Sequence, residues 1–367
     1  MKLNNRTTMK TQLRLTLALT CWLPLTNLLR ADQIDDYVKQ QMKQRHIPGL
    51  SLAVVKNNKI IKAKGYGLAN VELNVPATKD TVYEIGSVTK VFTATAVMML
   101  VNDGKVGLDD TITNYLSGLP QAWAGITVRH LLSHTSGITN DYVDVGETST
   151  RLRNPLSPKE FLESATNFPL ASRPGEKWAY SNTGFYLLGL IIEKASGKSY
   201  ADFMRQRIFI PLGMDSTGVY SQETVITNRA RGYVWWKYGG LHNGNYWDTS
   251  WPYSAGGVTS SVMDLVNWDA ALYTDKLLPQ ARLEQMWATE AGRYSLAWGV
   301  SISSRYGRWL NHWGGTPGFS SGIERWLDQK LTIIVLANMH EVPSWEIVVG
   351  IRHFFLPDVP ERPQSKN

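Results

Sequence analysis

The run from Val91 to Val101 is apolar at almost every position, and it constrains the fold more than any other part of the sequence. A helix that is apolar on all sides packs inside a core rather than across its surface. Just before this run, Ser87 and Lys90 are three residues apart, so on a helix their side chains lie on one face within a single turn. Gly86 and Gly104 fit the two ends of the helix. The sequence therefore predicts a buried helix that places a hydroxyl beside an amine.

These two side chains have the chemistry of an activated nucleophile. A serine hydroxyl reacts readily when a neighbouring group takes its proton, and Lys90 can take that proton if burial lowers its pKa. The N-terminal end of a helix also favours negative charge that develops at Ser87. Because the S-x-x-K spacing also occurs by chance on ordinary buried helices, other motifs must support this interpretation.

The first 31 residues have the pattern of a secretory signal peptide. Basic residues precede an apolar stretch from Leu15 to Leu29, and Ala31 precedes an acidic residue. Pro24 and Asn27 interrupt the stretch, which is too short for a membrane span. We therefore predict a signal peptide over residues 1–31, a periplasmic or secreted protein, and no stable membrane span after cleavage.

Removal of this segment changes both the charge and the cysteine content. The full chain has 38 Lys and Arg against 31 Asp and Glu, a net charge of +7. Five of the basic residues and none of the acidic residues lie in the segment, so the remainder carries only +2, which argues against a nucleic-acid partner. The single cysteine, Cys21, is removed as well, so thiolate metal sites and cysteine nucleophiles are excluded. The histidines lack metal-ligand spacing, and we expect no metal site.

Strand signals lie towards the two ends of the chain, and helix signals dominate the middle. Asn57-Asn58 separates two β-type runs and predicts a hairpin. Thr127 and Ser157 are predicted N-caps of helices. Further helices are predicted at 33–45, 108–116, 185–195, 200–209, 263–273 and 345–355, and strands at 294–301, 320–326 and 331–337.

This order predicts an α/β (α+β) fold in which both ends of the chain form one antiparallel sheet flanked by helices, beside a mainly helical part. The predicted domain covers 32–357, with a tail at 358–367. We assign the sheet part to about 33–86 and 255–357, and the helical part to about 87–254. A cleft between the two parts is the expected active site.

A second motif is formed by Tyr180 and Asn182, which are two residues apart just before a predicted helix. In extended or turn conformation such residues point the same way. A phenol can shuttle protons when a nearby cation lowers its pKa, and an amide offers both a donor and an acceptor to a substrate. Taken alone, the motif is better explained by an Asn at a helix N-cap beside a half-buried Tyr.

A third motif, from Asn311 to Phe319, is rich in glycine at the expected edge of a strand. Glycines such as Gly314 and Gly315 allow bare backbone to approach a ligand and to present N–H groups to an oxyanion. His312 adds a side chain that is only partly cationic at neutral pH. A turn of this kind also occurs without any function, so the motif gains weight only from the other two.

Together and in this order, the three motifs resemble those of the serine β-lactamase and penicillin-binding-protein superfamily. The Tyr-x-Asn form is similar to the branch that contains class C β-lactamases, D-alanyl-D-alanine carboxypeptidases and related esterases. The resemblance extends over most of residues 33–357. Other family-like segments are Leu131-Leu132-Ser133-His134-Thr135-Ser136-Gly137, Arg173-Pro174-Gly175-Glu176, Pro211-Leu212-Gly213-Met214 and Ser254-Ala255-Gly256-Gly257.

The resemblance implies a β-lactamase/transpeptidase-like fold and a role for each motif residue. Ser87 would be acylated, Lys90 would share its proton, and Tyr180 would act as base or proton relay. Asn182 and His312 would contact the substrate, as would the backbone of Gly314 and Gly315, and the N–H groups of Ser87 and Gly315 would form the oxyanion hole. The implied reaction is acyl transfer to serine followed by hydrolysis, without a cofactor, on a small-molecule or peptide substrate, a cell-wall peptide included.

Trp313 is a departure from the family pattern, which usually places a Thr or Ser between the cation and the glycine of the third motif. That hydroxyl helps hold the carboxylate of a β-lactam or of a D-Ala-D-Ala terminus. Trp313 has no hydroxyl, and His312 carries only partial charge. An ester, amide or small peptide without that carboxylate is therefore at least as good a candidate substrate as a β-lactam.

Two alternatives stay open, and one histidine is set aside. Residues 318–322 satisfy G-x-S-x-G with Ser320 as the elbow serine, but an α/β-hydrolase elbow joins a strand to a helix, and here the pattern continues as a strand. A non-catalytic peptidoglycan-binding or ligand-binding relative is the second alternative, although the complete set of predicted catalytic side chains argues against it. His134, at the end of a predicted helix, is expected to be structural.

Overall fold

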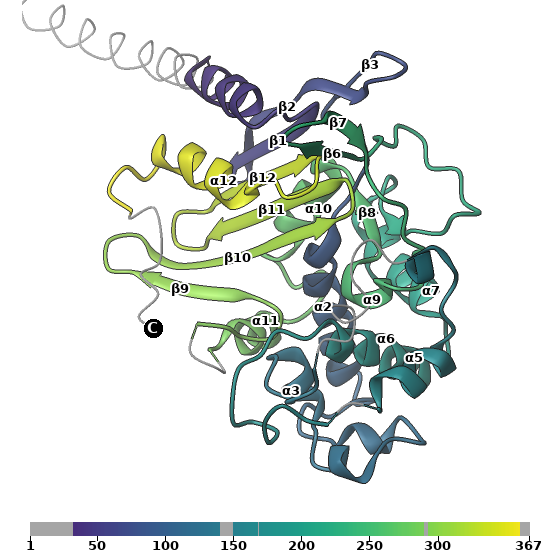
Figure 1. Ribbon diagram of the computed structural model, residues 1–367. Helices are drawn as coiled ribbons and strands as arrows, with labels where there is room; N and C mark the ends of the chain where they lie inside the picture. Colours follow the sequence, from purple (N-terminus) through teal and green to yellow (C-terminus); the bar gives the residue numbers. More distant parts are fainter. Residues whose placement is uncertain (1–31, 140–149, 168, 290–292, 360–367) are drawn as a thin grey trace, which may run out of the picture.

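The computed structural model describes residues 32–139, 150–167, 169–289 and 293–359 (Figure 1). The predicted signal peptide, with Cys21 and the cleavage position Ala31, lies outside the described residues, and so does most of the predicted tail. A large antiparallel sheet with helices on both faces confirms the predicted mixed fold class. The predicted boundary between a sheet part and a helical part remains a prediction.

The main sheet has seven strands in the order β3-β2-β1-β12-β11-β10-β9, and every neighbouring pair is antiparallel. Both ends of the chain build it, because β1 pairs with β12 over seven residues, from Leu50 opposite Ala337 to Lys56 opposite Leu331. The strands are β1 Gly49–Lys56, β2 Lys59–Asn70, β3 Val75–Pro76, β9 Gly299–Ser303, β10 Gly307–Thr316, β11 Phe319–Trp326 and β12 Leu331–Ala337.

Each face of the sheet is covered by its own hydrophobic cluster. The helix over residues 32–44 and α12 (Ser344–His353) pack against one face. α2 (Thr89–Asn102) and α10 (Val262–Ala271) belong to the cluster on the other face. In Figure 1, α2 and α10 lie behind the sheet and α12 lies in front of it. α2 is buried from Thr89 to Leu100, as its apolar sequence predicts.

The remaining elements surround α2. The other helices are α3 Val128–Leu132, α5 Pro158–Ala165, α6 Asn182–Ser196, α7 Tyr200–Met204, a π-helical segment Arg205–Phe209, α8 Ile210–Leu212, α9 Tyr253–Gly256 and α11 Gln280–Trp287. Short 3-10 helices occupy Gly86–Val88, Ile112–Asn114, Gln121–Trp123 and Thr150–Arg153. Two small sheets contain β4 Tyr83–Glu84, β8 Val258–Ser260 and β5 Gly218–Val219, and β6 Tyr233–Trp236 with β7 Gly240–Asn243.

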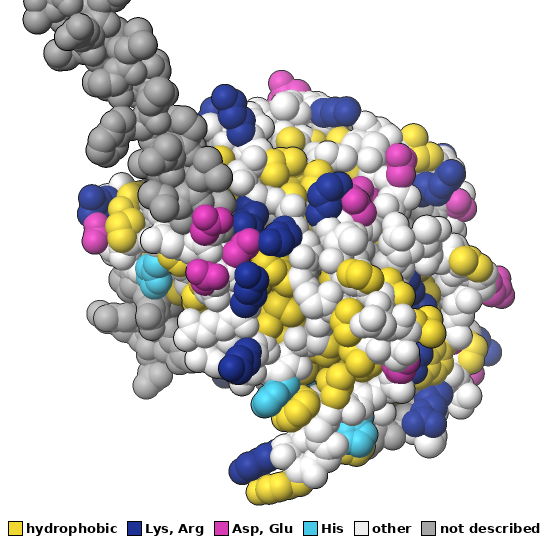
Figure 2. Space-filling model, turned by 90° about the horizontal axis from the view of Figure 1, so that it is seen from above, with side chains coloured by type: hydrophobic (Ala, Val, Ile, Leu, Met, Phe, Trp, Pro, Cys, Tyr) yellow, Lys and Arg dark blue, Asp and Glu magenta, His cyan; other side chains and the backbone are white. Residues whose placement is uncertain are grey.

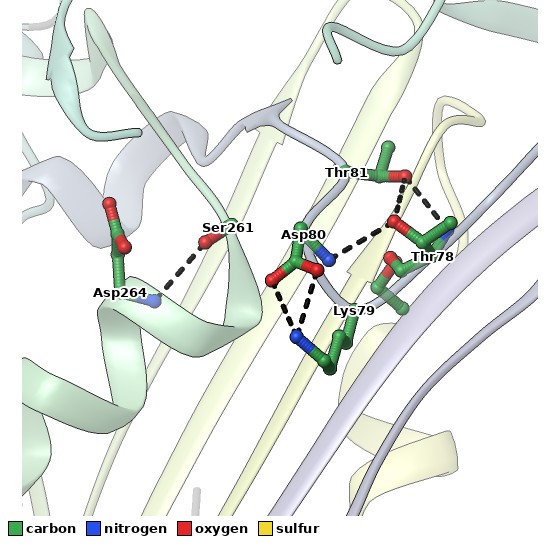
Figure 3. A network of polar contacts seen from close by, with 7 residues as sticks. Thr78, Lys79, Asp80, Thr81, Ser261 and Asp264 are labelled. Atoms are coloured by element: carbon green, nitrogen blue, oxygen red, sulfur yellow. Dashed lines mark hydrogen bonds and ion pairs between the residues drawn. The ribbon is translucent and has the colours of Figure 1, made fainter. Parts of the chain in front are cut away.

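Several local signals in the sequence are confirmed. Asn57 and Asn58 form the turn between β1 and β2 with φ of 51° and 58°, as a two-residue hairpin with right-handed twist requires. Thr127 and Ser157 each form a complete capping box at the start of α3 and α5. The connection before β4 is held by short-range bonds between Thr78 and Thr81 and by the Lys79–Asp80 ion pair (Figure 3).

Three predicted elements differ from the structure. The strand expected at 294–301 is β9, at Gly299–Ser303, and the helix expected at 108–116 is only the 3-10 turn Ile112–Asn114. The third motif was expected to be a turn at a strand edge, but residues up to Thr316 lie inside β10, where they pair with β11. Pairing with a neighbouring strand overrides the turn tendency of glycine, and no local pattern reports that pairing.

Charge is spread rather than concentrated on the visible surface. Figure 2 shows Lys and Arg side chains beside Asp and Glu side chains on the face seen from above, with apolar side chains between them. This distribution agrees with the small net charge expected for residues 32–367. Within the described ranges, no helix combines the length and apolar character that a membrane span requires.

Candidate active site

Ser87 and Lys90 lie where the short helix Gly86–Val88 leads into α2. Lys90 Nζ lies 3.1 Å from Ser87 Oγ, 2.7 Å from Asn182 Oδ1 and 2.7 Å from the Ala255 carbonyl oxygen. The lysine side chain is fully buried, while Ser87 is half-buried. The hydroxyl and the amine are therefore adjacent, with the hydroxyl nearer to solvent.

The surroundings of Lys90 favour its neutral form. The three oxygen atoms that contact Nζ belong to a hydroxyl, an amide and a backbone carbonyl, all of which are uncharged. Burial therefore lowers the pKa of Lys90 well below its usual value. A neutral amine can donate its two protons to Asn182 and Ala255 and keep its lone pair for the Ser87 hydroxyl. This arrangement suits a group that takes the serine proton.

Tyr180 completes the contacts of the serine. Its hydroxyl lies 2.7 Å from Ser87 Oγ, and Lys90 Nζ lies 4.8 Å from the centre of its ring. Burial raises the pKa of Tyr180, which keeps the phenol protonated. Ser181 is the N-cap of α6 and accepts a hydrogen bond from Gly184 N, so Asn182 is the first helical residue rather than the cap. The structure thus brings Ser87, Lys90, Tyr180 and Asn182 together.

Two glycines allow β10 to lie directly against the backbone that carries Ser87. A Cβ atom on Gly314 would lie 2.2 Å from the Ile85 carbonyl oxygen and 3.0 Å from Ser87 N. Gly86 has φ of +50°, and a Cβ there would lie 2.7 Å from Gly315 N. Both positions are too crowded for a side chain. The backbone N–H groups of Ser87 and Gly315 are therefore held close to one another.

His312 and Trp313 lie on opposite faces of β10. His312 is buried, and its Nδ1 is 2.8 Å from the Trp313 carbonyl oxygen while its Nε2 is 3.4 Å from the Tyr294 hydroxyl. Burial and the neighbouring Lys90 lower the pKa of His312 to about 3, so the ring is neutral. The Trp313 ring packs over Gly322, on the face covered by α12. Tyr294, which no motif indicated, lies outside the regular strands and reaches the site through this contact with His312 and through ring packing on His134.

A cavity of about 300 Å³ lies next to the segments that carry Ser87 and Gly315, although neither of these two residues lines it. Glu84, three residues before Ser87, lines it and pairs with Arg229 at 3.1 Å. Thr316, which follows Gly315, also lines it. Its walls further include the aromatic residues Tyr220, Tyr246, Trp247 and Phe319.

The outer edge of β10 is only partly paired. β9 pairs with β10 from Gly307 to Asn311. Among the described residues, no strand of the sheet pairs along the outer edge of the following segment, His312 to Thr316. An extended substrate backbone can add to such an edge.

The α/β-hydrolase alternative is wrong. Ser320 lies inside β11, is buried, and donates a hydrogen bond to the Met339 carbonyl oxygen at 2.9 Å. The chain continues through β11 as a strand, so the strand-to-helix elbow is absent. In the described part of the chain, no three His, Cys, Asp or Glu side chains gather as metal ligands.

Comparisons with known proteins agree with this architecture. The family model described as Beta-lactamase matches residues 34–345. Penicillin-binding protein 4* of Bacillus subtilis (strain 168) is 31% identical over 355 residues, which cover 89% of this chain and 77% of that protein. Protein flp of Staphylococcus aureus is 30% identical over 84% of this chain, which spans only 63% of its length. D-amino acid amidase from Ochrobactrum anthropi SV3, solved with D-phenylalanine, has a TM-score of 0.76 and 27% identity over 88% of this chain and 97% of that chain.

Proposed function

The chain belongs to the beta-lactamase family, a group of serine hydrolases, and from this premise we propose that it hydrolyses acyl compounds through an ester formed on Ser87. The observation that carries this proposal is the position of Ser87 Oγ, 3.1 Å from a buried amine and 2.7 Å from the hydroxyl of the half-buried Tyr180. The hydroxyl of Ser320, the serine of the G-x-S-x-G pattern, instead donates to the backbone carbonyl of Met339, just after β12.

In the first step, Ser87 Oγ attacks the carbonyl carbon and its proton moves to the lone pair of Lys90 Nζ. We propose Lys90 rather than Tyr180 as the base, because burial favours the neutral amine and the protonated phenol. The carbonyl oxygen becomes an oxyanion. The backbone N–H groups of Ser87 and Gly315 are the donors proposed to bind it.

In the second step, the tetrahedral intermediate collapses and the bond to the leaving nitrogen or oxygen breaks. Tyr180, whose hydroxyl lies next to Ser87 Oγ, gives its proton to the leaving group and regains one from the Lys90 ammonium. A water molecule then attacks the serine ester, losing a proton to the neutral amine, and Ser87 recovers its proton as the acid product leaves. Asn182 orients Lys90 and is placed to contact the substrate amide.

Among the candidate substrates, we favour amides and esters of aromatic D-amino acids over β-lactams and peptides with a free C-terminal carboxylate. His312 is neutral and Trp313 points to the other face of β10, so these two positions of the third motif offer neither a cation nor a hydroxyl to a carboxylate. The adjoining cavity has aromatic walls that suit a ring. The similar amidase was solved with D-phenylalanine. His312, Gly314 and Gly315 would line the path of the substrate.

We also propose that residues 1–31 direct export, so that the enzyme acts in the periplasm or outside the cell, where a cell-wall peptide is one accessible substrate. The basic start and short apolar stretch of this segment support the proposal. N-terminal sequencing of the protein recovered from the culture medium or periplasm would test it, with Asp32 as the expected first residue.

The hydrolase proposal is tested by a substrate panel and a covalent probe. We expect D-phenylalanine amide and p-nitrophenyl esters to be hydrolysed faster than nitrocefin or D-Ala-D-Ala peptides. A fluorophosphonate should label the peptide that contains Ser87, and Ser87→Ala should abolish both labelling and turnover, whereas Ser320→Ala should leave the labelling of Ser87 intact. Absence of labelling and turnover in the wild type would favour the alternative, a non-catalytic peptidoglycan-binding or ligand-binding relative.

A further inference from the structure

His134 is a buried histidine whose contacts surround Tyr180. It follows α3, is only 1% exposed, and has φ of +57°, a backbone conformation that is unfavourable for most residues. Its carbonyl oxygen accepts a hydrogen bond from Ala179 N at 2.8 Å, and its ring Nδ1 accepts one from Ser181 N at 3.1 Å. The amides on both sides of Tyr180 are therefore bound to this one residue.

The ring of His134 also contacts the phenol directly. Its centre lies 4.5 Å from that of Tyr180, 5.0 Å from that of Phe185 and 5.1 Å from that of Tyr294. These contacts limit the movement of the Tyr180 ring, whose hydroxyl must stay near Ser87 Oγ. A shift of about 1 Å in such a group can reduce a rate by about 100-fold.

The hydrogen bond to Ser181 requires a neutral imidazole. Because Nδ1 accepts, the proton of the neutral ring is on Nε2, and a second proton would place two donors face to face. Burial, with Lys90 and His312 nearby, lowers the pKa of His134 well below its usual value. The titratable groups that face the ring are Lys90, Tyr180, Tyr294 and His312. None of these four groups is a carboxylate, so none of them favours a charged ring.

We propose that His134 is a positioning residue that fixes Tyr180 against Ser87 by binding the backbone on both sides of the tyrosine. This inference rests on the proposed hydrolase function. It extends the expectation that His134 is structural, because the structure it holds includes the segment that carries Tyr180. It also explains an unfavourable backbone conformation beside the site, since that conformation aims the carbonyl oxygen and the ring nitrogen at the same short segment.

The test compares two substitutions of nearly equal shape. His134→Asn keeps an acceptor close to the position of Nδ1 and tolerates positive φ, whereas His134→Leu has no acceptor. We expect His134→Leu to lower kcat by about 100-fold with KM nearly unchanged, and His134→Asn to recover at least about tenfold of that loss. His130→Leu is the matched control, because His130 Nδ1 also accepts a backbone N–H, from Thr127, at a position away from Tyr180.

Amide hydrogen exchange gives a readout that does not depend on activity. The Ser181 amide should exchange faster in His134→Leu than in the wild type and should stay protected in His134→Asn. The Ala179 amide, bound to the backbone of residue 134, is the internal reference. If His134→Leu does not fold, the kcat and the Ser181 exchange rate of His134→Asn test the proposal by themselves. A loss of kcat by about 100-fold in His134→Asn with Ser181 still protected would overturn the proposal.

Other outcomes separate this proposal from the hydrolase proposal. Equal kcat in both His134 variants and the wild type would overturn the positioning role while leaving the hydrolase intact. A wild type that neither turns over substrate nor is labelled at Ser87 would overturn the hydrolase. The Ser181 exchange data would in that case still report whether His134 holds the segment.

Discussion

Lys90 and Arg352 are both almost completely buried, yet the protein surrounds them in opposite ways. Arg352 lies 3.2 Å from Oε2 of the Glu324 carboxylate. The other oxygen of that carboxylate, Oε1, accepts a hydrogen bond from Trp326 Nε1. The hydrogen-bond partners of Lys90 Nζ are three uncharged oxygen atoms. Burial raises the pKa of Glu324 and Arg352 opposes that rise, whereas no carboxylate opposes the effect of burial on Lys90.

A buried basic group can therefore serve either stability or chemistry, depending on its partner. A buried ion pair offsets part of its own desolvation cost, and it becomes costly only when one partner is removed. A buried amine without a counter-charge instead loses its proton and becomes a base. Arg325 with Asp269, on the other side of the sheet from α12, follows the first pattern. The second pattern is found at Lys90, beside Ser87, where the proposed hydrolysis requires a base.

The largest expected effect comes from removing the Lys90 amine, which has no counter-charge. Lys90→Met should lower the rate of acylation by about 10⁴-fold, because Ser87 loses its base. It should change the stability only a little, since the cost of burying an amine without a counter-charge is removed while the Asn182 and Ala255 oxygens lose a donor. Stopped-flow acylation and urea denaturation measure the two quantities. Lys105→Met, at the exposed end of the same helix region, is the control and should change neither by much.

Removing one partner of the ion pair should have the reverse effect. Glu324→Gln should lower the free energy of unfolding by about 3–5 kcal/mol, because Arg352 would remain buried without its counter-charge. The turnover number of the folded fraction should be unchanged. Glu284→Gln breaks an exposed pair with Arg308 and should cost no more than about 1 kcal/mol. Equal losses in the two variants would show that burial of the Glu324–Arg352 pair makes no difference to its cost.

A carboxylate beside Lys90 should convert the buried amine without a counter-charge into a buried ion pair. Asn182→Asp places a carboxylate at the position 2.7 Å from Nζ, which should raise the pKa of Lys90. Activity at neutral pH should fall by about 100-fold and should recover as pH rises. Asn267→Asp adds the same charge at an exposed position and serves as control. A pH profile identical to that of the wild type would show that Lys90 is not the titrating base.

The smallest expected effect is a dependence of the free energy of unfolding on pH. Because the pKa of Lys90 is lower in the folded protein than its usual value of 10.5, the unfolded chain binds more protons between those two values. The free energy of unfolding should therefore rise with pH in that window, by at most about 1.4 kcal/mol per pH unit. Lys90→Met should lose this contribution. Denaturation at several pH values measures the difference between the two slopes.

Local signals in the sequence predicted local structure well. The hairpin at Asn57-Asn58, both capping boxes and the buried helix after Ser87 depend on a few neighbouring residues, and each is present. The family resemblance of the three motifs also predicted which side chains would meet at Ser87. The spacing within each motif would not have been sufficient for that prediction. The residue roles remain predictions until they are measured.

Features that depend on distant residues were not predictable. β10 contains a glycine-rich segment whose local pattern favours a turn, and only its pairing with β11 makes it a strand. Tyr294 lies outside regular structure, and its contact with His312 follows from packing between distant segments. His134 was assigned to the helix end because nothing in its neighbourhood indicates that Ser181, 47 positions away, would bind its ring.

The close approach of Gly314 to the backbone before Ser87 limits how this enzyme can diversify. Because a methyl group at either Gly86 or Gly314 would collide with main-chain atoms, neither position can be used to reshape recognition. New preferences would have to arise in the segments around Tyr220 and Tyr246, which line the cavity without bearing on that contact. Descendants of this protein are thus expected to change their substrate preference long before they change their reaction mechanism.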